Sequence, residues 1–329
     1  MEQVIVKIVM LSLLGFTGFI AGRKRYLPEE AGTILSRVVI KLTAPVLILT
    51  TMASRSFEPD DFKNGIWIYG FGIFFILLAY FISVFASKRM GLEGATANIY
   101  KMQSMFGNVI FLAFPLFSSL TSVFGDKGII YAIFFNLAND TLLWTLGIYL
   151  VNKHKNIQWK DNLKHLINGN TLAFALGLAC IILNLQYYVG KFPLVKDVYT
   201  IIYDTFNPLG NTTIYLSMLF IGLILSEVKI DSMKELLKRY RIFILAFLKL
   251  LFVPLLATLV FYMLGGLVDP IVKSTVVLQL AMPCATIVTA LASQHDSDYK
   301  FATESVFITT LLGIITLPLI VGIIQMFGK

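Results

Sequence analysis

Apolar stretches of about 20 residues recur along the whole chain, and each is long enough to cross a bilayer core of about 30 Å. The 329 residues are 57% hydrophobic and 14% charged, and the mean hydropathy is +0.80. Such a composition is not that of a soluble globular protein. We expect an all-α membrane protein with ten transmembrane spans. The predicted spans are residues 3–22, 31–54, 64–87, 95–118, 127–151, 169–187, 197–226, 240–264, 271–293 and 299–327.

Positive charges predict the orientation of these spans. The run RKR at residues 23–25 follows the first apolar stretch, whereas a cleaved signal peptide carries its positive charge before that stretch. The loops after the first, third, fifth and seventh spans are rich in Lys and Arg, so the positive-inside rule puts them in the cytoplasm. We expect a multi-pass protein of the cell membrane with both termini external. Basic loops beside anionic lipid also account for the net charge of +8 without a nucleic-acid partner.

Patterns typical of enzymes and metal sites are not found in the sequence. Cys180 and Cys284 fall in different predicted spans, and His154, His165 and His295 lack the spacing of metal ligands. HExxH, Walker and GxSxG motifs are also missing. We expect no enzymatic activity and no cofactor other than a coupling ion.

An internal comparison predicts that the chain consists of two inverted five-span halves. Pro45 in the second span and Pro208 in the seventh occupy similar places, and so do Asp140 in the fifth and Glu304 in the tenth. An odd number of spans in each half inverts one half relative to the other. We assign residues 1–151 to the first repeat, 152–168 to a cytoplasmic connector and 169–329 to the second repeat, all within one membrane domain.

The fourth and ninth spans contain helix breakers at corresponding places. The segment QSMFGNVIFLAFPLF carries Gly107 and Pro115, and LQLAMPCATIVT carries Pro283. Proline removes a backbone donor and opens the helix, and polar backbone groups exposed in this way need protein or a water-filled cavity beside them. A plain proline kink is the alternative for either segment alone. The matched pair favours two broken helices that form a binding site.

Three segments carry a resemblance to the auxin efflux carrier family: FGNVIFLAFPL, PLGNTTIYLSMLFIGLIL and AMPCATIVTALASQHDSDYKFATESVFITTLLGIITLPL. This family includes plant PIN auxin carriers and bacterial permeases for malate or malonate, and it is distantly similar to the bile-acid sodium symporters. The resemblance implies that helices 4 and 9 cross at their breaks and that carboxylates bind beside the crossing. Asn108 matches the family's substrate-contacting asparagine, and Pro283 matches its crossing proline. Ile110 and Ala113 stand where the family often has glycine, so the substrate itself is not implied.

Polar residues at the breaks are the candidate ligands of a small organic anion. Backbone amides at a broken helix favour an anion, and the side chain of Asn108 can donate to a carboxylate or cap its own half-helix. Lys41, near the middle of the second span, either supplies a counter-charge, pairs with a buried acid or extends towards the interface. The candidate substrate-binding residues are Lys41, Asn108, Val109, Asn211, Pro283, Cys284, Ala285 and Thr286.

A polar stripe in the fifth span is the candidate coupling site. Asn136, Asn139 and Asp140 share one helical face, and Glu304 is the matching acid in the tenth span. Oxygen ligands could hold Na⁺, whereas a buried acid could carry H⁺, and hydrogen bonding between helices is the alternative role. The sequence therefore predicts a secondary transporter of small mono- or dicarboxylates that works by alternating access, with homodimerisation left open. A channel, a membrane sensor or a sodium-coupled symporter of the bile-acid type is the alternative.

Overall fold

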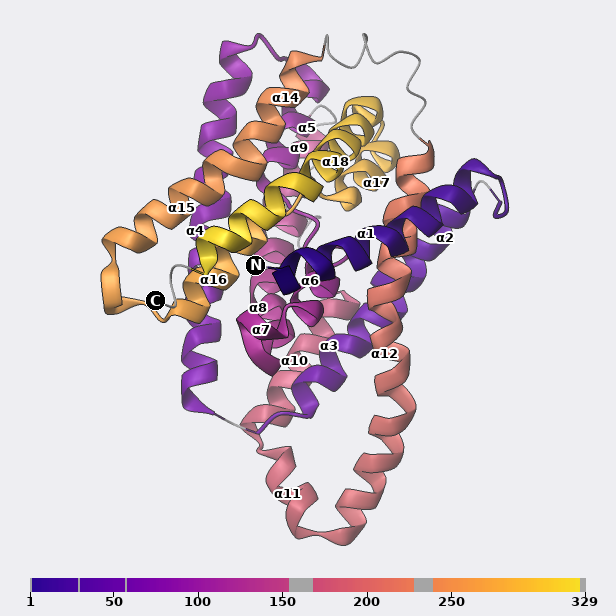
Figure 1. Ribbon diagram of the computed structural model, residues 1–329, viewed down its shortest axis with the longest axis vertical. Coiled ribbons are helices and arrows are strands. Elements are labelled where there is room, and N and C mark those ends of the chain that lie inside the picture. The colour runs from indigo at the N-terminus through magenta and orange to yellow at the C-terminus, as the bar shows by residue number, and fades with distance from the viewer. Residues whose placement is uncertain (1, 29, 57, 154–167, 228–238, 326–329) are drawn as a thin grey trace.

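The computed structural model describes residues 2–28, 30–56, 58–153, 168–227 and 239–325, and this part of the chain is helical (Figure 1). The helices are α1 (Glu2–Arg23), α2 (Ala31–Val38), α3 (Ala44–Ala53), α4 (Pro59–Arg89), α5 (Gly94–Met105), α6 (Ala113–Ser119), α7 (Thr121–Phe124), α8 (Gly128–Leu142), α9 (Ile148–Asn152), α10 (Gly169–Ile182), α11 (Leu185–Lys191), α12 (Pro193–Glu227), α14 (Tyr240–Phe247), α15 (Val253–Met263), α16 (Pro270–Leu280), α17 (Thr286–Gln294) and α18 (Tyr299–Ile324). Most of the predicted connector, residues 154–167, lies outside the described residues.

Six continuous helical segments are long and apolar enough to cross a membrane, and a seventh is obtained if α10 and α11, bent by 54°, form one span. The prediction of an all-α membrane protein is confirmed at this level, while ten spans in an inverted repeat remain a prediction. The six segments are Ala31–Ala53, Pro59–Arg89, Gly125–Asn152, Pro193–Ser226, Tyr240–Met263 and Tyr299–Ile324. The predicted spans 95–118 and 271–293 are each divided into two short helices by a non-helical stretch.

Three of the long segments contain a single π-helical turn that the sequence did not predict. These turns are η1 (Val39–Thr43), η3 (Leu143–Gly147) and η6 (Leu248–Phe252). Pro45 follows η1 and Pro254 follows η6, so a proline without an N–H group lies just after two of the widened turns. π turns are frequent at functional sites.

The helices pack into two groups. In the first bundle, α1, α2, α3, α10, α11 and α12 contact one another, whereas α4, α5, α6, α8, α9 and α14 to α18 form the second bundle. Figure 1 shows α10 and α11 in the lower part of the molecule, α12 rising from there along the right, and α4, α15 and α16 along the left. Each bundle draws helices from both predicted halves of the chain, so the two predicted repeats are not separate packing units. The second bundle holds most of the largest buried side chains, including Phe75, Tyr100, Phe106, Phe114 and Phe135.

Small residues let α1 and α12 pack with their backbones almost in contact. A Cβ atom on Gly222 would lie 1.9 Å from the carbonyl oxygen of Gly15, and one on Gly18 would lie 2.3 Å from the carbonyl oxygen of Leu219. Water does not drive association between helices in a bilayer, so close backbone packing through small residues stabilises the pair. The first bundle therefore depends on these glycines.

We predict that Gly222→Ala destabilises the protein by about 2 to 3 kcal/mol, because the added methyl group meets backbone atoms that cannot rotate away. Gly70→Ala is the matched control, since a Cβ atom at Gly70 in α4 has no neighbour within 4 Å and alanine has the higher helix propensity. Thermal unfolding of the purified protein in detergent measures both variants. Equal stability of Gly222→Ala and the wild type would contradict the packing.

Candidate functional site

The first interruption lies between α5 and α6. Helix α5 ends at Met105, Phe106 adopts extended backbone angles (φ −92°, ψ 130°), and α6 begins only at Ala113. In the stretch between them, the N–H of Val109 donates to the carbonyl oxygen of Gly107 at 2.9 Å. The helix thus opens at Gly107, as predicted.

Pro115 does not open the helix. It occupies the first turn of α6, where a proline is tolerated because the N–H groups of that turn have no helical partner. The carbonyl oxygen of Asn108 accepts from the N–H groups of Leu112 and Ala113, both at 3.2 Å. Pro115 therefore lies on the downstream side of the break, where the second half-helix starts.

The second interruption lies between α16 and α17. Helix α16 ends at Leu280, Pro283 lies within the break as predicted, and α17 begins at Thr286. The N–H of Met282 donates to the carbonyl oxygen of Gln279 at 3.3 Å, and the N–H of Val288 donates to that of Ala285 at 3.1 Å. Residues 281–285, between the two helices, are therefore not helical.

The two interruptions pair with each other in antiparallel orientation, and we call residues 106–112 and 281–285 the crossing. Asn108 N–H donates to the carbonyl oxygen of Pro283 at 2.9 Å, and Ala285 N–H donates to that of Phe106 at 3.2 Å. Gly107 and Cys284 form the β-bridge between them. Backbone groups freed by one break are thus satisfied by the other, as hydrocarbon requires. The backbone N–H groups of Asn108 and Ala285 therefore already have acceptors and are not free to bind an anion.

Side chains from neighbouring helices anchor the crossing. Lys249, buried in η6, donates from Nζ to the carbonyl oxygen of Met105 at 3.1 Å. The N–H of Cys284 donates to Oγ1 of Thr309 at 3.1 Å, and its thiol contacts the carbonyl oxygen of Gln103 at 3.4 Å. Sequence reasoning assigned Lys249 no site role because no motif surrounds it, although its depth in an apolar span was a visible signal.

A small cavity of about 30 Å³ lies beside the crossing. This volume is room for one or two water molecules. Two buried oxygens of the lining, Oγ1 of Thr286 and Oδ1 of Asn139, have no hydrogen-bond partner among the described residues. Seven predicted site residues line the cavity: Gly107, Asn108, Val109, Asn139, Asp140, Ala285 and Thr286.

Asp140 is the centre of a buried group of amides, which we call the polar cluster: Asn136, Asn139, Asp140 and Asn170. Nδ2 of Asn136 lies 3.4 Å from Oδ2 of Asp140, and the side chains of Asn139 and Asn170 are close enough to act electrostatically on this carboxylate. The Oδ1 atoms of all three asparagines are buried without a partner in the part of the chain that is described. Asn170, from α10, was missed because it comes from a distant helix. Its neighbour Asn168 caps that helix and starts it here.

Other predicted site residues lie elsewhere. Lys41 is exposed in η1, and its neighbour Ile40 lines the cavity instead. Asn211 is half-buried in α12 and is not part of the cavity lining. Glu304 forms an ion pair with Arg239, which gives its carboxylate a local partner. Pro283 and Cys284 belong to the crossing but do not line the cavity.

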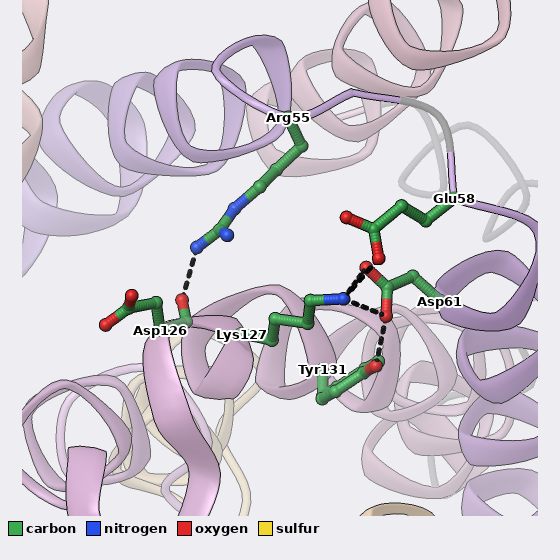
Figure 2. A network of polar contacts seen from close by, with 6 residues as sticks. All are labelled: Arg55, Glu58, Asp61, Asp126, Lys127 and Tyr131. Carbon is green, nitrogen blue, oxygen red and sulfur yellow. Dashed lines mark hydrogen bonds and ion pairs between the residues drawn. The ribbon is translucent and has the colours of Figure 1, made fainter.

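A further polar network lies where α3 ends and α4 begins (Figure 2). Nζ of Lys127 lies 2.8 Å from Oδ2 of Asp61, and Arg55 donates to the carbonyl oxygen of Asp126. Arg55 follows the first bundle and Asp126 belongs to the second, so this network joins the bundles at one end. Its paired and partly exposed charges contribute little energy, and we do not assign it a binding role. Its members are Arg55, Glu58, Asp61, Asp126, Lys127 and Tyr131.

Comparisons with known proteins give matches over almost the whole chain. The model of a family described as "Membrane transport protein" matches residues 3–157 and 152–321. A protein of Methanocaldococcus jannaschii described as an uncharacterized transporter is 25% identical over 327 residues, which cover 96% of both chains. Another protein with that description, from Methanothermobacter thermautotrophicus, is 24% identical over 318 residues, again covering 96% of both chains.

We predict that Thr309→Val destabilises the protein by about 1 to 3 kcal/mol, because it leaves the buried N–H of Cys284 at the crossing without its acceptor. Thr303→Val is the matched control on the same helix, since its exposed hydroxyl bonds only to the carbonyl oxygen of Tyr299. That change is expected to stay within about 0.5 kcal/mol. Thermal unfolding in detergent compares them, and equal effects would show that the side-chain anchor is dispensable.

Proposed function

This chain belongs to the membrane transport protein family, in agreement with its resemblance to the auxin efflux carriers, and we propose that it is a secondary transporter of small organic anions. The substrate binds in the cavity beside the crossing and is released on the other side by alternating access. The observation that carries this proposal is the convergence of two interrupted helices on one cavity with Asn108, Thr286 and the polar cluster around it. Broken helices at mid-membrane are typical of transporter binding sites.

The charges near the crossing support an anionic substrate. Nζ of Lys249 lies 3.5 Å from the position that a Cβ atom on Gly107 would occupy, so a buried ammonium group adjoins the opened backbone. The side-chain amide group of Asn108 and the hydroxyl of Thr286 can donate hydrogen bonds to a carboxylate. Lys249 therefore takes the counter-charge role that the sequence suggested for Lys41.

In this proposal, Asp140 couples binding of the substrate to binding of H⁺ or Na⁺. A carboxylate substrate and an ionised Asp140 would both lie at one small cavity with little water to separate their charges, and burying two like charges together is unfavourable. Binding of the anion is thus linked to neutralisation of Asp140 by H⁺ or Na⁺. The unpartnered oxygens of Asn136, Asn139 and Asn170 are suited to hold Na⁺ or to accept a bond from protonated Asp140.

The cavity must enlarge for a carboxylate to enter, because about 30 Å³ holds only water. Ile40 and Asn170 belong to the first bundle, whereas the rest of the cavity lining and the polar cluster belong to the second. Movement of one bundle against the other therefore opens the cavity and separates Asn170 from Asp140. In our proposal this movement occurs in the cell membrane with both termini external, in a ten-span protein whose first and second repeats are residues 1–151 and 169–329.

We predict that Asn108→Ala weakens the apparent affinity for transported substrate about ten- to a hundredfold, the loss of one hydrogen bond to a charged group, or about 1.5 to 3 kcal/mol. Uptake of labelled malonate, malate and acetate into proteoliposomes first identifies a transported anion and then measures its half-saturation concentration. Asn207→Ala in α12, half-buried and outside the cavity lining, is the control. Equal affinities of Asn108→Ala and the wild type would argue against the crossing as the site.

We predict that Asp140→Asn exchanges substrate across the membrane but does not accumulate it, because the substitution keeps the shape and removes the ionisable group. Counterflow of labelled substrate measures exchange, and uptake under an imposed H⁺ or Na⁺ gradient measures accumulation. The ion whose gradient drives the wild type identifies the coupling. If the variant concentrates substrate as the wild type does, Asp140 has no coupling role and its polar cluster serves helix packing.

A further inference from the structure

A larger cavity of about 400 Å³ lies where α4 ends and α5 begins. It shares no residue with the cavity at the crossing. We call it the lysine pocket, because Lys88, Lys101 and Lys153 line it together with a single carboxylate, that of Glu93. The rest of its lining includes the apolar side chains of Val84, Leu92 and Ala97.

The three lysines come from separate segments and repel one another. Lys88 lies in the last turn of α4, Lys101 in α5 and Lys153 directly after α9, and Lys101 is close enough to both others for electrostatic repulsion. Nζ of Lys101 donates to Oδ1 of the buried Asn98 at 3.4 Å. In the described part of the chain, none of these three lysines is seen in an ion pair. A bound anion would relieve the repulsion.

The surface of α4 beside the pocket is that of a membrane boundary. Phe81 and Phe85, in the turns before Lys88, are 65% and 62% exposed, and the guanidinium of Arg89 lies 5.1 Å from the centre of the Phe85 ring. Neither Arg89 nor Phe85 lines the lysine pocket. Exposed apolar rings suit contact with acyl chains, and basic residues just beyond them are typical of the cytoplasmic end of a membrane span. A ligand of the pocket can thus arrive along the bilayer surface.

We propose that the lysine pocket binds the phosphate-bearing headgroup of an anionic phospholipid. A phosphate offers several charged acceptor oxygens to converging ammonium groups, and the apolar side of the pocket suits the carbon atoms that adjoin the headgroup. The predicted topology puts the loop with Lys88 in the cytoplasm, the side on which basic pockets between helices bind anionic headgroups. This site is separate from the one proposed for the transported anion.

Lipid binding to the purified full-length protein tests the proposal. Native mass spectrometry in detergent with added phosphatidylglycerol or phosphatidylcholine measures binding of each lipid, and thermal unfolding with millimolar inorganic phosphate tests the free anion. We expect preferential binding of phosphatidylglycerol. Each single change among Lys88→Gln, Lys101→Gln and Lys153→Gln should weaken that binding about fivefold, the equivalent of about 1 kcal/mol per lysine.

The matched control is Lys300→Gln. Lys300 is exposed in the first turn of α18 and is not in the pocket lining, so this variant removes the same charge and should bind phosphatidylglycerol as the wild type does. Equal binding of the two lipids, or unchanged binding in all three pocket variants, would overturn the proposal. Stabilisation by inorganic phosphate without preference for phosphatidylglycerol would assign the pocket to a soluble phosphate compound and would also overturn the lipid assignment.

Discussion

The need to satisfy backbone groups at membrane depth governs the centre of this protein. Two helices stop at Met105 and Leu280, and in hydrocarbon each freed amide or carbonyl group costs several kcal/mol unless it finds a partner. The two breaks meet this requirement by pairing with each other, and Lys249 and Thr309 add a donor and an acceptor from neighbouring helices. Neither interrupted helix could therefore be stable in this form without the other.

This pairing also determines which hydrogen-bonding groups at the crossing can bind a ligand. Because the amides of Asn108 and Ala285 are used in the crossing, recognition falls to side chains, chiefly those of Asn108, Thr286 and the polar cluster. Asp140 accepts a hydrogen bond from Asn136 of α8 in the second bundle and lies near Asn170 of α10 in the first. A change in the charge of Asp140 therefore alters the interactions at the boundary between the two bundles, where they must separate. In our account, this contact links ion binding to the opening of the cavity.

The sequence predicted features that depend on local chemistry. Long apolar runs fix the membrane helices, Gly107 and Pro283 mark the breaks, and the spacing of Asn136, Asn139 and Asp140 puts them on one face. Contacts between distant segments could not be predicted in the same way. Lys249 and Asn170 reach the site only through tertiary packing, and Lys41, equally deep in its span, is exposed because the turn of η1 directs Ile40 to the cavity. Which side of a break a proline occupies is also not fixed by the sequence, because a proline can either end a helix or lie in its first turn.

Substrate protection of a cysteine in the cavity tests the central claim most directly. In a variant with Cys180 and Cys284 replaced by alanine, Thr286→Cys places a thiol in the cavity lining, whereas Gly190→Cys in α11 places one in open space. Labelling by N-ethylmaleimide is measured with and without a saturating concentration of a transported carboxylate. The account predicts that the carboxylate slows labelling at position 286 and leaves position 190 unchanged. Equal labelling rates at position 286 with and without the carboxylate would contradict binding at the crossing.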